Sequence, residues 1–189
     1  MRVKGWAVLL VAVGCAYAVG RGCDFAGRTH HAGEGAKAAP LPRQRRAVAE
    51  GTVVSVRDGD SIVVMRGGVG IEVRLDGIDC PELAQAYGRK AKSFTSGLVF
   101  GKAVRLVGKG KDRYDRELAE VLLPDGRSLN KVLVAAGLAW WYRAYSTDRT
   151  LESLEHTARR QRLGLWADSN PVPPWDFRVS NQRRPGGGG

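Results

Sequence analysis

The sequence predicts an α+β domain built around a small barrel of five strands, with about three helices. Three short runs rich in β-branched residues open the domain and are separated by Asp-Gly and Gly-Gly pairs; they lie at 51–56, 61–66 and 71–78. A stretch with helical spacing follows at 87–100, and two more strand-like runs come after it. Short strands interleaved with one helix and followed by further helices favour a small barrel with α additions.

The strands differ in how they are joined. Because only short turns separate the first three runs, we expect them to form an antiparallel meander. The fourth and fifth runs, at 102–108 and 117–126, have the same strand composition, and a Pro-Asp-Gly turn closes the fifth. Five strands of this kind supply the predicted barrel.

Helices are expected where apolar residues recur at helical spacing. The first ends near Gly101 and carries Ala91, Phe94, Thr95 and Leu98. Asn130 is expected to cap a short second helix over 131–137. A third, within 150–164, has one apolar face formed by Leu151, Leu154 and Ala158. Near the end, "PVPPW" at 171–175 predicts an extended segment across the domain.

Composition divides the chain into four parts. Residues 1–18 have a basic start, a short apolar stretch and an Ala-Tyr-Ala triplet, which predicts a signal peptide and export. Two alternatives stay open: an uncleaved membrane anchor, and a lipoprotein signal ending at Cys15. Residues 19–49 are expected to be a flexible linker, 50–178 the folded domain and 179–189 a disordered tail. The protein would then contact a membrane only if its first segment is retained.

The charge balance is strongly basic. The formal net charge is +11, the sequence pI is about 10.1, and 43% of residues are hydrophobic, which is enough for a core and excludes a disordered polymer. Such a charge favours a polyanionic partner, either nucleic acid or an anionic membrane surface, although it could serve solubility alone. No feature of the sequence indicates a protein partner, and we expect a monomer.

Cysteine and histidine are too few for a zinc site. The chain contains no CxxC pair and three histidines. Apart from Cys15, the cysteines are Cys23 in the predicted linker and Cys80 in the predicted domain. In an exported protein these two could oxidise, but the sequence does not decide whether they meet.

Acidic residues gather at two of the predicted turns. Asp60 stands between the first two strands, while a second group follows the third strand: Asp76, Asp79 and Glu82. In a meander the end of the third strand can return to the first turn, so that these acids meet and need a cation. Carboxylates without His or Cys are hard oxygen ligands that suit Ca²⁺ or Mg²⁺. Taken singly, each segment is also ordinary turn or loop chemistry.

Two arginines accompany the acids. Arg74 lies in an apolar strand, on the same face as Asp76 by alternation, and a buried guanidinium requires an anionic partner. Arg116 lies just before or inside the fifth strand. A divalent cation flanked by two guanidinium groups is suited to binding a phosphodiester, although each arginine alone is more often structural.

Six segments together resemble one known family. They are "VRDGDSI", "VRLDGIDCPE", "YGRKAKSFTS", "DRYDRELAEV", "LNKVLVAAGLAWWY" and "LESLEHTARRQRLGLW", which together span most of residues 51–166. Their order and spacing resemble those of the staphylococcal nuclease-like domains, also called thermonucleases. The resemblance implies an OB-fold-type barrel of five strands with helices, and Ca²⁺-dependent cleavage of DNA and RNA.

The resemblance also implies roles for individual residues. It makes Asp60 and Asp79 the calcium carboxylates and the backbone carbonyl of Cys80 a further ligand. Glu82 matches the glutamate assigned as the general base that activates water, and Arg74 and Arg116 match the phosphate-binding pair. Water would displace the 5′-oxygen and leave a 3′-phosphate end.

Three positions depart from the family pattern. Cys80 and Ser61 each stand where threonine is usual, and both changes keep what the site needs: a main-chain carbonyl and a hydroxyl group. Asp115 stands where glycine is usual and adds an acid beside Arg116. If that turn needs a positive φ, the aspartate imposes strain.

Other readings of function remain open. Trp140, Trp141, Tyr142 and Tyr145 could stack on bases, but core packing is at least as good an explanation of the tryptophans. A non-catalytic OB-like module that binds nucleic acid or protein is the main alternative to a nuclease, and a basic protein held on an anionic envelope is a third.

Overall fold

A computed structural model describes residues 46–182 of the chain, with side chains from Glu50 onward. The predicted signal peptide at 1–18, most of the predicted linker at 19–49 and residues 183–189 lie outside the described residues, as does Cys23, so those predictions stay predictions. Within the described part, no helix combines the length and the apolar character that a membrane crossing needs.

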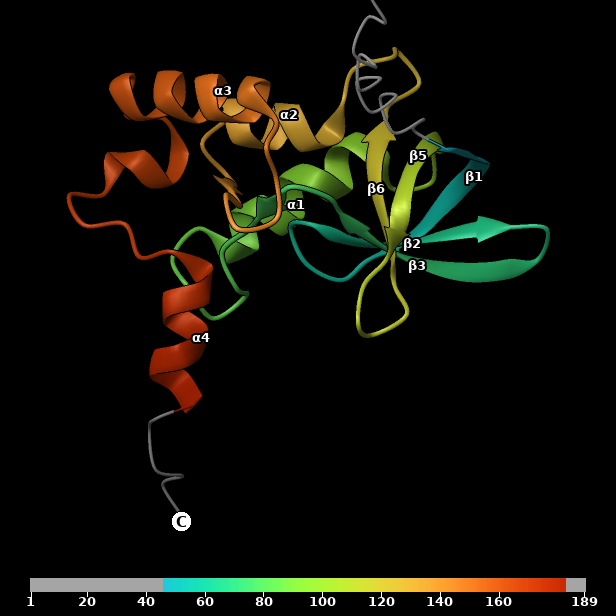
Figure 1. The fold of residues 1–189 in the computed structure, drawn as a ribbon, viewed down its shortest axis with the longest axis horizontal. Helices are drawn as coiled ribbons and strands as arrows, with labels where there is room; N and C mark the ends of the chain where they lie inside the picture. Colours follow the sequence, from blue (N-terminus) through green and yellow to red (C-terminus); the bar gives the residue numbers. More distant parts are fainter. Residues whose placement is uncertain (1–45, 183–189) are drawn as a thin grey trace, which may run out of the picture. The chain divides into compact units, whose positions relative to one another are not determined.

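Five strands close into the predicted barrel (Figure 1). They are β1 (Arg46–Val56), β2 (Ser61–Arg66), β3 (Val69–Leu75), β5 (Ala103–Lys111) and β6 (Glu117–Leu122). The order around the barrel is β1-β2-β3-β6-β5, with β3 and β6 parallel and the other neighbouring pairs antiparallel. The α+β class, the five-stranded barrel and the opening antiparallel meander are confirmed.

A second, very short sheet lies outside the barrel. Its strands are β4 (Ile78–Asp79) and β7 (Trp140–Trp141), which pair antiparallel with Asp79 opposite Trp140. Both tryptophan residues are only 7% exposed, so they pack in the interior and are not stacking platforms for bases. Tyr145, by contrast, is 72% exposed.

Residues 46–182 contain four α-helices and one 3-10 helix, one α-helix more than the three expected. The α-helices are α1 (Gly88–Val99), α2 (Leu129–Ala135), α3 (Arg149–Arg160) and α4 (Pro174–Gln182), and the 3-10 helix is η1 (Gly164–Ala167). In Figure 1, α1 and α2 lie beside the barrel strands, α3 packs on α2, and α4 follows near the C-terminal end.

Three local expectations differ from the structure. Ser128, not Asn130, caps α2: its side chain accepts from the Lys131 N–H, while Asn130 is 2% exposed and bonds to Val121 and Asp76. The expected extended segment becomes helix at Pro174, because proline suits a first helical turn, whose N–H groups lack helical partners. The boundaries also shift: β1 begins at 46, inside the predicted linker, and α4 ends at 182, inside the predicted tail.

The barrel is filled by apolar side chains from every strand and from two helices. The fully buried set includes Val53, Ile62, Val64, Val73, Leu75, Leu106 and Val121 from strands, with Ala91, Val99, Leu129 and Leu133 from α1 and α2. A closely packed interior of this kind resists small displacements. It therefore gives the turns between strands a rigid support.

Candidate active site

Asp60 is held by the turn between β1 and β2. Its N–H donates to Oδ1 of Asp58 at 3.0 Å, and the hydroxyl of Thr95 on α1 donates to the Gly59 carbonyl at 2.6 Å. A Cβ atom at Gly59 would lie 2.7 Å from the Cys80 sulfur, so this close approach requires glycine. The turn is therefore fixed against both α1 and the segment that contains Cys80.

The end of β4 returns to this turn, as the meander predicted. The backbone N–H of Cys80 donates to Oδ2 of Asp60 at 2.6 Å. Asp79, the preceding residue, is 1% exposed and lies in the β4–β7 ladder, which fixes its backbone. Two carboxylates that are nineteen positions apart in the sequence thus reach one buried place.

Arg74 joins these two carboxylates. The register of β2 and β3 places Arg74 opposite Ser61, next to Asp60. Its guanidinium forms ion pairs with Asp60 and, at 2.7 Å, with Oδ1 of Asp79, and its side chain is 14% exposed. Burial opposes the charge on Arg74, but the carboxylates of Asp60 and Asp79 outweigh it and raise the pKa of the guanidinium.

The partner of Arg74 differs from the one that strand alternation suggested. Asp76 forms an ion pair with Lys109 of β5, and its N–H donates to the Ala119 carbonyl of β6 at 2.9 Å. The anionic partners of Arg74 therefore come from the β1–β2 turn and from β4. Alternation along one strand identifies the face of a side chain but not the residues that other segments bring to it.

Glu82 lies in the loop between β4 and α1 and reaches the cluster through another arginine. Oε1 of Glu82 accepts from Nη1 of Arg178 at 2.7 Å, and Nη2 of Arg178 donates to Oδ2 of Asp79 at 2.7 Å. Arg178 belongs to α4, and sequence reasoning missed it. It is one of three arginines that follow the six family-like segments, and it is the last residue of the predicted domain, so no local pattern marked it.

Arg116 makes different contacts. Its backbone precedes Glu117, which pairs with Val73 of β3, so the residue enters the barrel one strand away from Arg74. Its guanidinium binds Asp112, with Nε and Nη2 each 2.8 Å from Oδ2. Among the described contacts, none joins this guanidinium to the acids around Arg74. A phosphate-binding role for Arg116 stays a prediction and would require the pair with Asp112 to open.

Asp115 has the backbone conformation that the glycine pattern suggested. Its φ is 64°, in the left-handed region that disfavours side chains other than Gly, Asn and Asp. Its carboxylate accepts from Lys111 at 2.7 Å and is 82% exposed, so it points at solvent and a lysine.

Burial changes the protonation of two neighbouring groups. Desolvation and then the charge on Asp60 raise the pKa of Asp58 to about 6. Desolvation likewise raises the pKa of the Cys80 thiol well above its usual value. Cys80 is a buried free thiol, and its backbone N–H is the group that donates to Asp60.

The donors at this place suit a hard divalent cation in chemistry. Asp60 and Asp79 offer carboxylate oxygens in a buried position, and such oxygens are the ligands that Ca²⁺ and Mg²⁺ prefer. The two acids require positive charge, which the guanidinium groups of Arg74 and Arg178 supply in this structure. Within residues 46–182 no three His, Cys, Asp or Glu side chains are grouped for a metal ion, so backbone oxygens and water would complete any such site.

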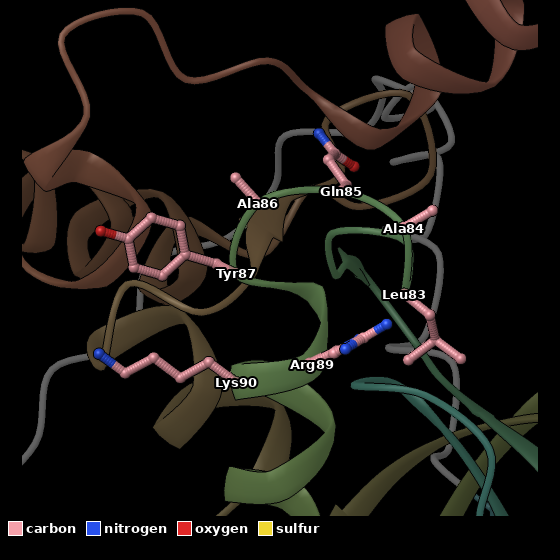
Figure 2. A pocket seen from close by; sticks show the side chains of 7 residues that line it. All are labelled: Leu83, Ala84, Gln85, Ala86, Tyr87, Arg89 and Lys90. Atoms are coloured by element: carbon pink, nitrogen blue, oxygen red, sulfur yellow. The ribbon is translucent and has the colours of Figure 1, made fainter.

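A surface pocket adjoins the loop that carries Glu82 (Figure 2). Its lining comes from the loop and from the first turn of α1: Leu83, Ala84, Gln85, Ala86, Tyr87, Arg89 and Lys90. The lining contains neither Asp60 nor Asp79. Lys90 lies 5.5 Å from the centroid of the Tyr87 ring; Arg89 and Lys90 are exposed, whereas Tyr87 is partly buried and packs against the hydrophobic core.

Comparison with known proteins places this geometry in context. The family model described as staphylococcal nuclease homologue matches residues 72–168. A protein of Escherichia coli O157:H7 named an uncharacterized endonuclease is 46% identical over 128 residues, which cover 68% of this chain and 84% of that protein. A micrococcal nuclease of Shigella flexneri is 41% identical over 142 residues, which cover 70% of this chain and 82% of that protein.

Proposed function

The chain belongs to the family of staphylococcal nuclease homologues, and from this we propose that it is a metal-dependent nuclease that hydrolyses phosphodiester bonds of DNA and RNA with little sequence preference. The observation that carries the proposal is the convergence of Asp60 and Asp79 on the buried guanidinium of Arg74. A fixed guanidinium beside a cation-binding pair of acids suits a reaction in which negative charge grows on phosphate oxygens.

The proposed reaction assigns each side chain a task. Glu82 takes a proton from the attacking water, and its carboxylate is 39% exposed, so water can reach it. Arg74 and Arg116 bind the equatorial phosphate oxygens, Arg116 after leaving Asp112. The water oxygen bonds to phosphorus, the bond between phosphorus and the 5′-oxygen breaks, and that oxygen takes up a proton from solvent, which gives a 5′-hydroxyl end and a 3′-phosphate end.

We propose Ca²⁺ as the cation, held by the carboxylates of Asp60 and Asp79 and the backbone carbonyl of Cys80. When bound, it supplies positive charge that offsets the charge growing on the phosphate. Support comes from the donor chemistry, which contains only oxygen ligands. The hydrogen bond from Cys80 to Asp60 and the β4–β7 ladder hold the backbone of these donors.

We further propose that the protein is exported and acts as a monomer. Export is supported by the composition of residues 1–18, a basic start followed by an apolar stretch. Calcium is abundant outside cells, so a calcium-dependent nuclease would be active there and inactive inside the cell that makes it. This proposal is separate from the chemistry of the site.

The function is tested by incubating the purified chain with plasmid DNA, single-stranded DNA and RNA over a Ca²⁺ titration. We expect cleavage that chelator abolishes and that Asp60→Ala reduces by about 100-fold or more. Asp125→Ala is the matched control, because Asp125 is an exposed carboxylate that forms an ion pair with Arg127 and not with any residue of the proposed site. It should leave cleavage unchanged.

The same experiment separates the nuclease from the non-catalytic alternative. Intact nucleic acid in every Ca²⁺ condition, with a folded sample that still binds the oligonucleotides, would favour an OB-like binding module. Cleavage that persists in chelator would instead contradict the role of the metal.

A further inference from the structure

A second guanidinium besides Arg74 contacts the predicted site residues, and it comes from outside the matched family region. Arg178 lies in α4, after residue 168, where the family match ends. Its Nη1 and Nη2 atoms each lie 2.7 Å from a carboxylate oxygen, on Glu82 and Asp79 respectively. This one side chain therefore bridges the proposed base and a proposed metal ligand.

Packing fixes the segment that carries this arginine. We call residues 171–182 the C-terminal strap. Trp175 of the strap stacks on Tyr142, with ring centroids 5.1 Å apart and planes 4° from parallel, and it meets the edge of Trp140 at 5.6 Å. Trp140 belongs to β7 and Tyr142 directly follows it, and β7 pairs with β4, the strand that contains Asp79. The strap is thus anchored to the same short sheet as the site.

A hydrogen-bonded link joins the strap to the Glu82 loop as well. Gln85 accepts from the Glu82 N–H at 3.1 Å and donates to the Val172 carbonyl at 2.5 Å. The strap is consequently tied to the loop of Glu82 at Val172 and to Glu82 itself at Arg178. Two attachments and an aromatic stack place the guanidinium reproducibly at this position.

We propose that Arg178 is a substrate-binding residue that binds a backbone phosphate of the nucleic acid beside Arg74; this rests on the proposed function. The two arginines differ in exposure: 14% of the Arg74 side chain is accessible and 39% of the Arg178 side chain. Arg178 is therefore the one that faces an arriving ligand. Its planar fork of N–H groups binds two oxygens at once, and phosphate has the same geometry as carboxylate for this purpose.

The balance of charge supports a phosphate at this position. In the described structure the carboxylates of Asp60, Asp79 and Glu82 are matched against the guanidinium groups of Arg74 and Arg178. A divalent cation at the acids would take over part of this pairing, so that Arg178 could turn to an anionic phosphodiester. Arg178 would donate to that diester from the solvent side after releasing a carboxylate, as Arg116 would after releasing Asp112.

The test measures binding without turnover on the full chain. The probe is a fluorescently labelled single-stranded oligonucleotide whose phosphorothioate linkages resist cleavage. Its affinity for the protein is measured by fluorescence anisotropy with and without Ca²⁺. The variants are Arg178→Gln, which removes the charge, and Arg178→Lys, which keeps the charge and loses the fork. Arg149→Gln is the matched control, because it removes one exposed charge from α3, where Arg149 forms an ion pair with Glu152.

We expect Arg178→Gln to weaken oligonucleotide binding by about tenfold. The slope of log affinity against log salt concentration should fall by the amount that corresponds to about one phosphate contact. Arg178→Lys should recover part of the affinity, and Arg149→Gln should change it less than about twofold. Calcium titration by calorimetry is run in parallel on the same proteins. Circular dichroism confirms folding, and if Arg178→Gln does not fold, the lysine variant decides, with intermediate affinity expected.

Two results would overturn the proposal. One is unchanged oligonucleotide affinity in both Arg178 variants. The other is tighter Ca²⁺ binding with faster cleavage and no loss of oligonucleotide affinity in Arg178→Gln, which would make the arginine an autoinhibitory counter-ion. Because the readout is binding, absence of cleavage by the unaltered chain would count against the proposed function and not against this contact.

Discussion

Asp115 illustrates how one residue can carry backbone strain without touching the chemistry. Its φ of 64° suits glycine, yet the turn before β6 forms with aspartate at this position. Aspartate tolerates the left-handed region better than most residues, because its short side chain can bond locally, here to Lys111. The exposed pair adds little stability, so the conformational cost dominates.

Replacing Asp115 with glycine should therefore stabilise the protein. We expect Asp115→Gly to raise the free energy of unfolding by about 0.5–1 kcal/mol, because glycine adopts this φ freely. Urea unfolding measures the change. Asp115→Ala is the control: it removes the same carboxylate but keeps the strain, so it should not be more stable than the unaltered chain. A loss of stability in the glycine variant would show that the Lys111 contact outweighs the strain.

The loop from Glu82 to the first turn of α1 is an element whose geometry depends on one glycine. A Cβ atom at Gly88 would lie 1.8 Å from the Glu82 carbonyl oxygen and 3.0 Å from the Leu83 Cα. The loop folds back on itself there, with the Gln85 N–H donating to the Glu82 carbonyl at 2.8 Å and the Gly88 N–H to the Gln85 carbonyl at 3.0 Å. Any side chain at this position must displace the backbone of Glu82.

This close approach predicts that Gly88→Ala lowers nuclease activity by about 100-fold, since displacing a reacting group by about an ångström has effects of that size. The matched control is Gly97→Ala in the same helix, where the new methyl group meets no atom within 4 Å. That control should retain activity and gain about 0.5–1 kcal/mol of stability from better helix propensity. Initial rates on single-stranded DNA and urea unfolding give both readouts. Equal rates in the two variants would contradict the prediction.

The whole molecule shows which features a sequence can predict. The barrel followed from alternating β-branched runs and turn pairs, because these are local properties of each segment. The meeting of Asp60 and Asp79 also followed, since a meander brings successive turns together. The contact between Arg178 and Glu82 could not be predicted: it depends on how Trp175 packs on Tyr142, and no local pattern encodes that packing. The pairing of Arg116 with Asp112 is different: it is a local contact, four positions apart in the turn between β5 and β6, that was not predicted from the sequence.

At this scale, the buried acids of the site would destabilise the fold without positive partners, and Arg74 is the more buried of the two arginines that pair with them. Arg74 connects the β1–β2 turn to β4 through Asp60 and Asp79, which are 4% and 1% exposed. A buried carboxylate without a partner costs several kcal/mol, so removing the arginine affects the stability of the entire barrel. The positive charge of the surface does not help, because it is screened by solvent.

Arg74→Met should accordingly lower the free energy of unfolding by about 3–5 kcal/mol in chelator, as expected when one partner of a buried ion pair is removed. Arg57→Met is the matched control, because Arg57 pairs with Glu72 at the surface, where the two side chains are 58% and 43% exposed, and its loss should cost at most about 1 kcal/mol. Millimolar Ca²⁺ should restore more stability to Arg74→Met than to the unaltered protein, since a bound cation replaces the missing charge, and binding to the folded state alone stabilises it. Urea unfolding of the three proteins with and without Ca²⁺ measures both effects. Equal losses of stability in the two methionine variants would mean that Asp60 and Asp79 do not depend on Arg74 for charge compensation. Equal gains of stability from Ca²⁺ in Arg74→Met and the unaltered protein would mean that the two acids do not share a cation site.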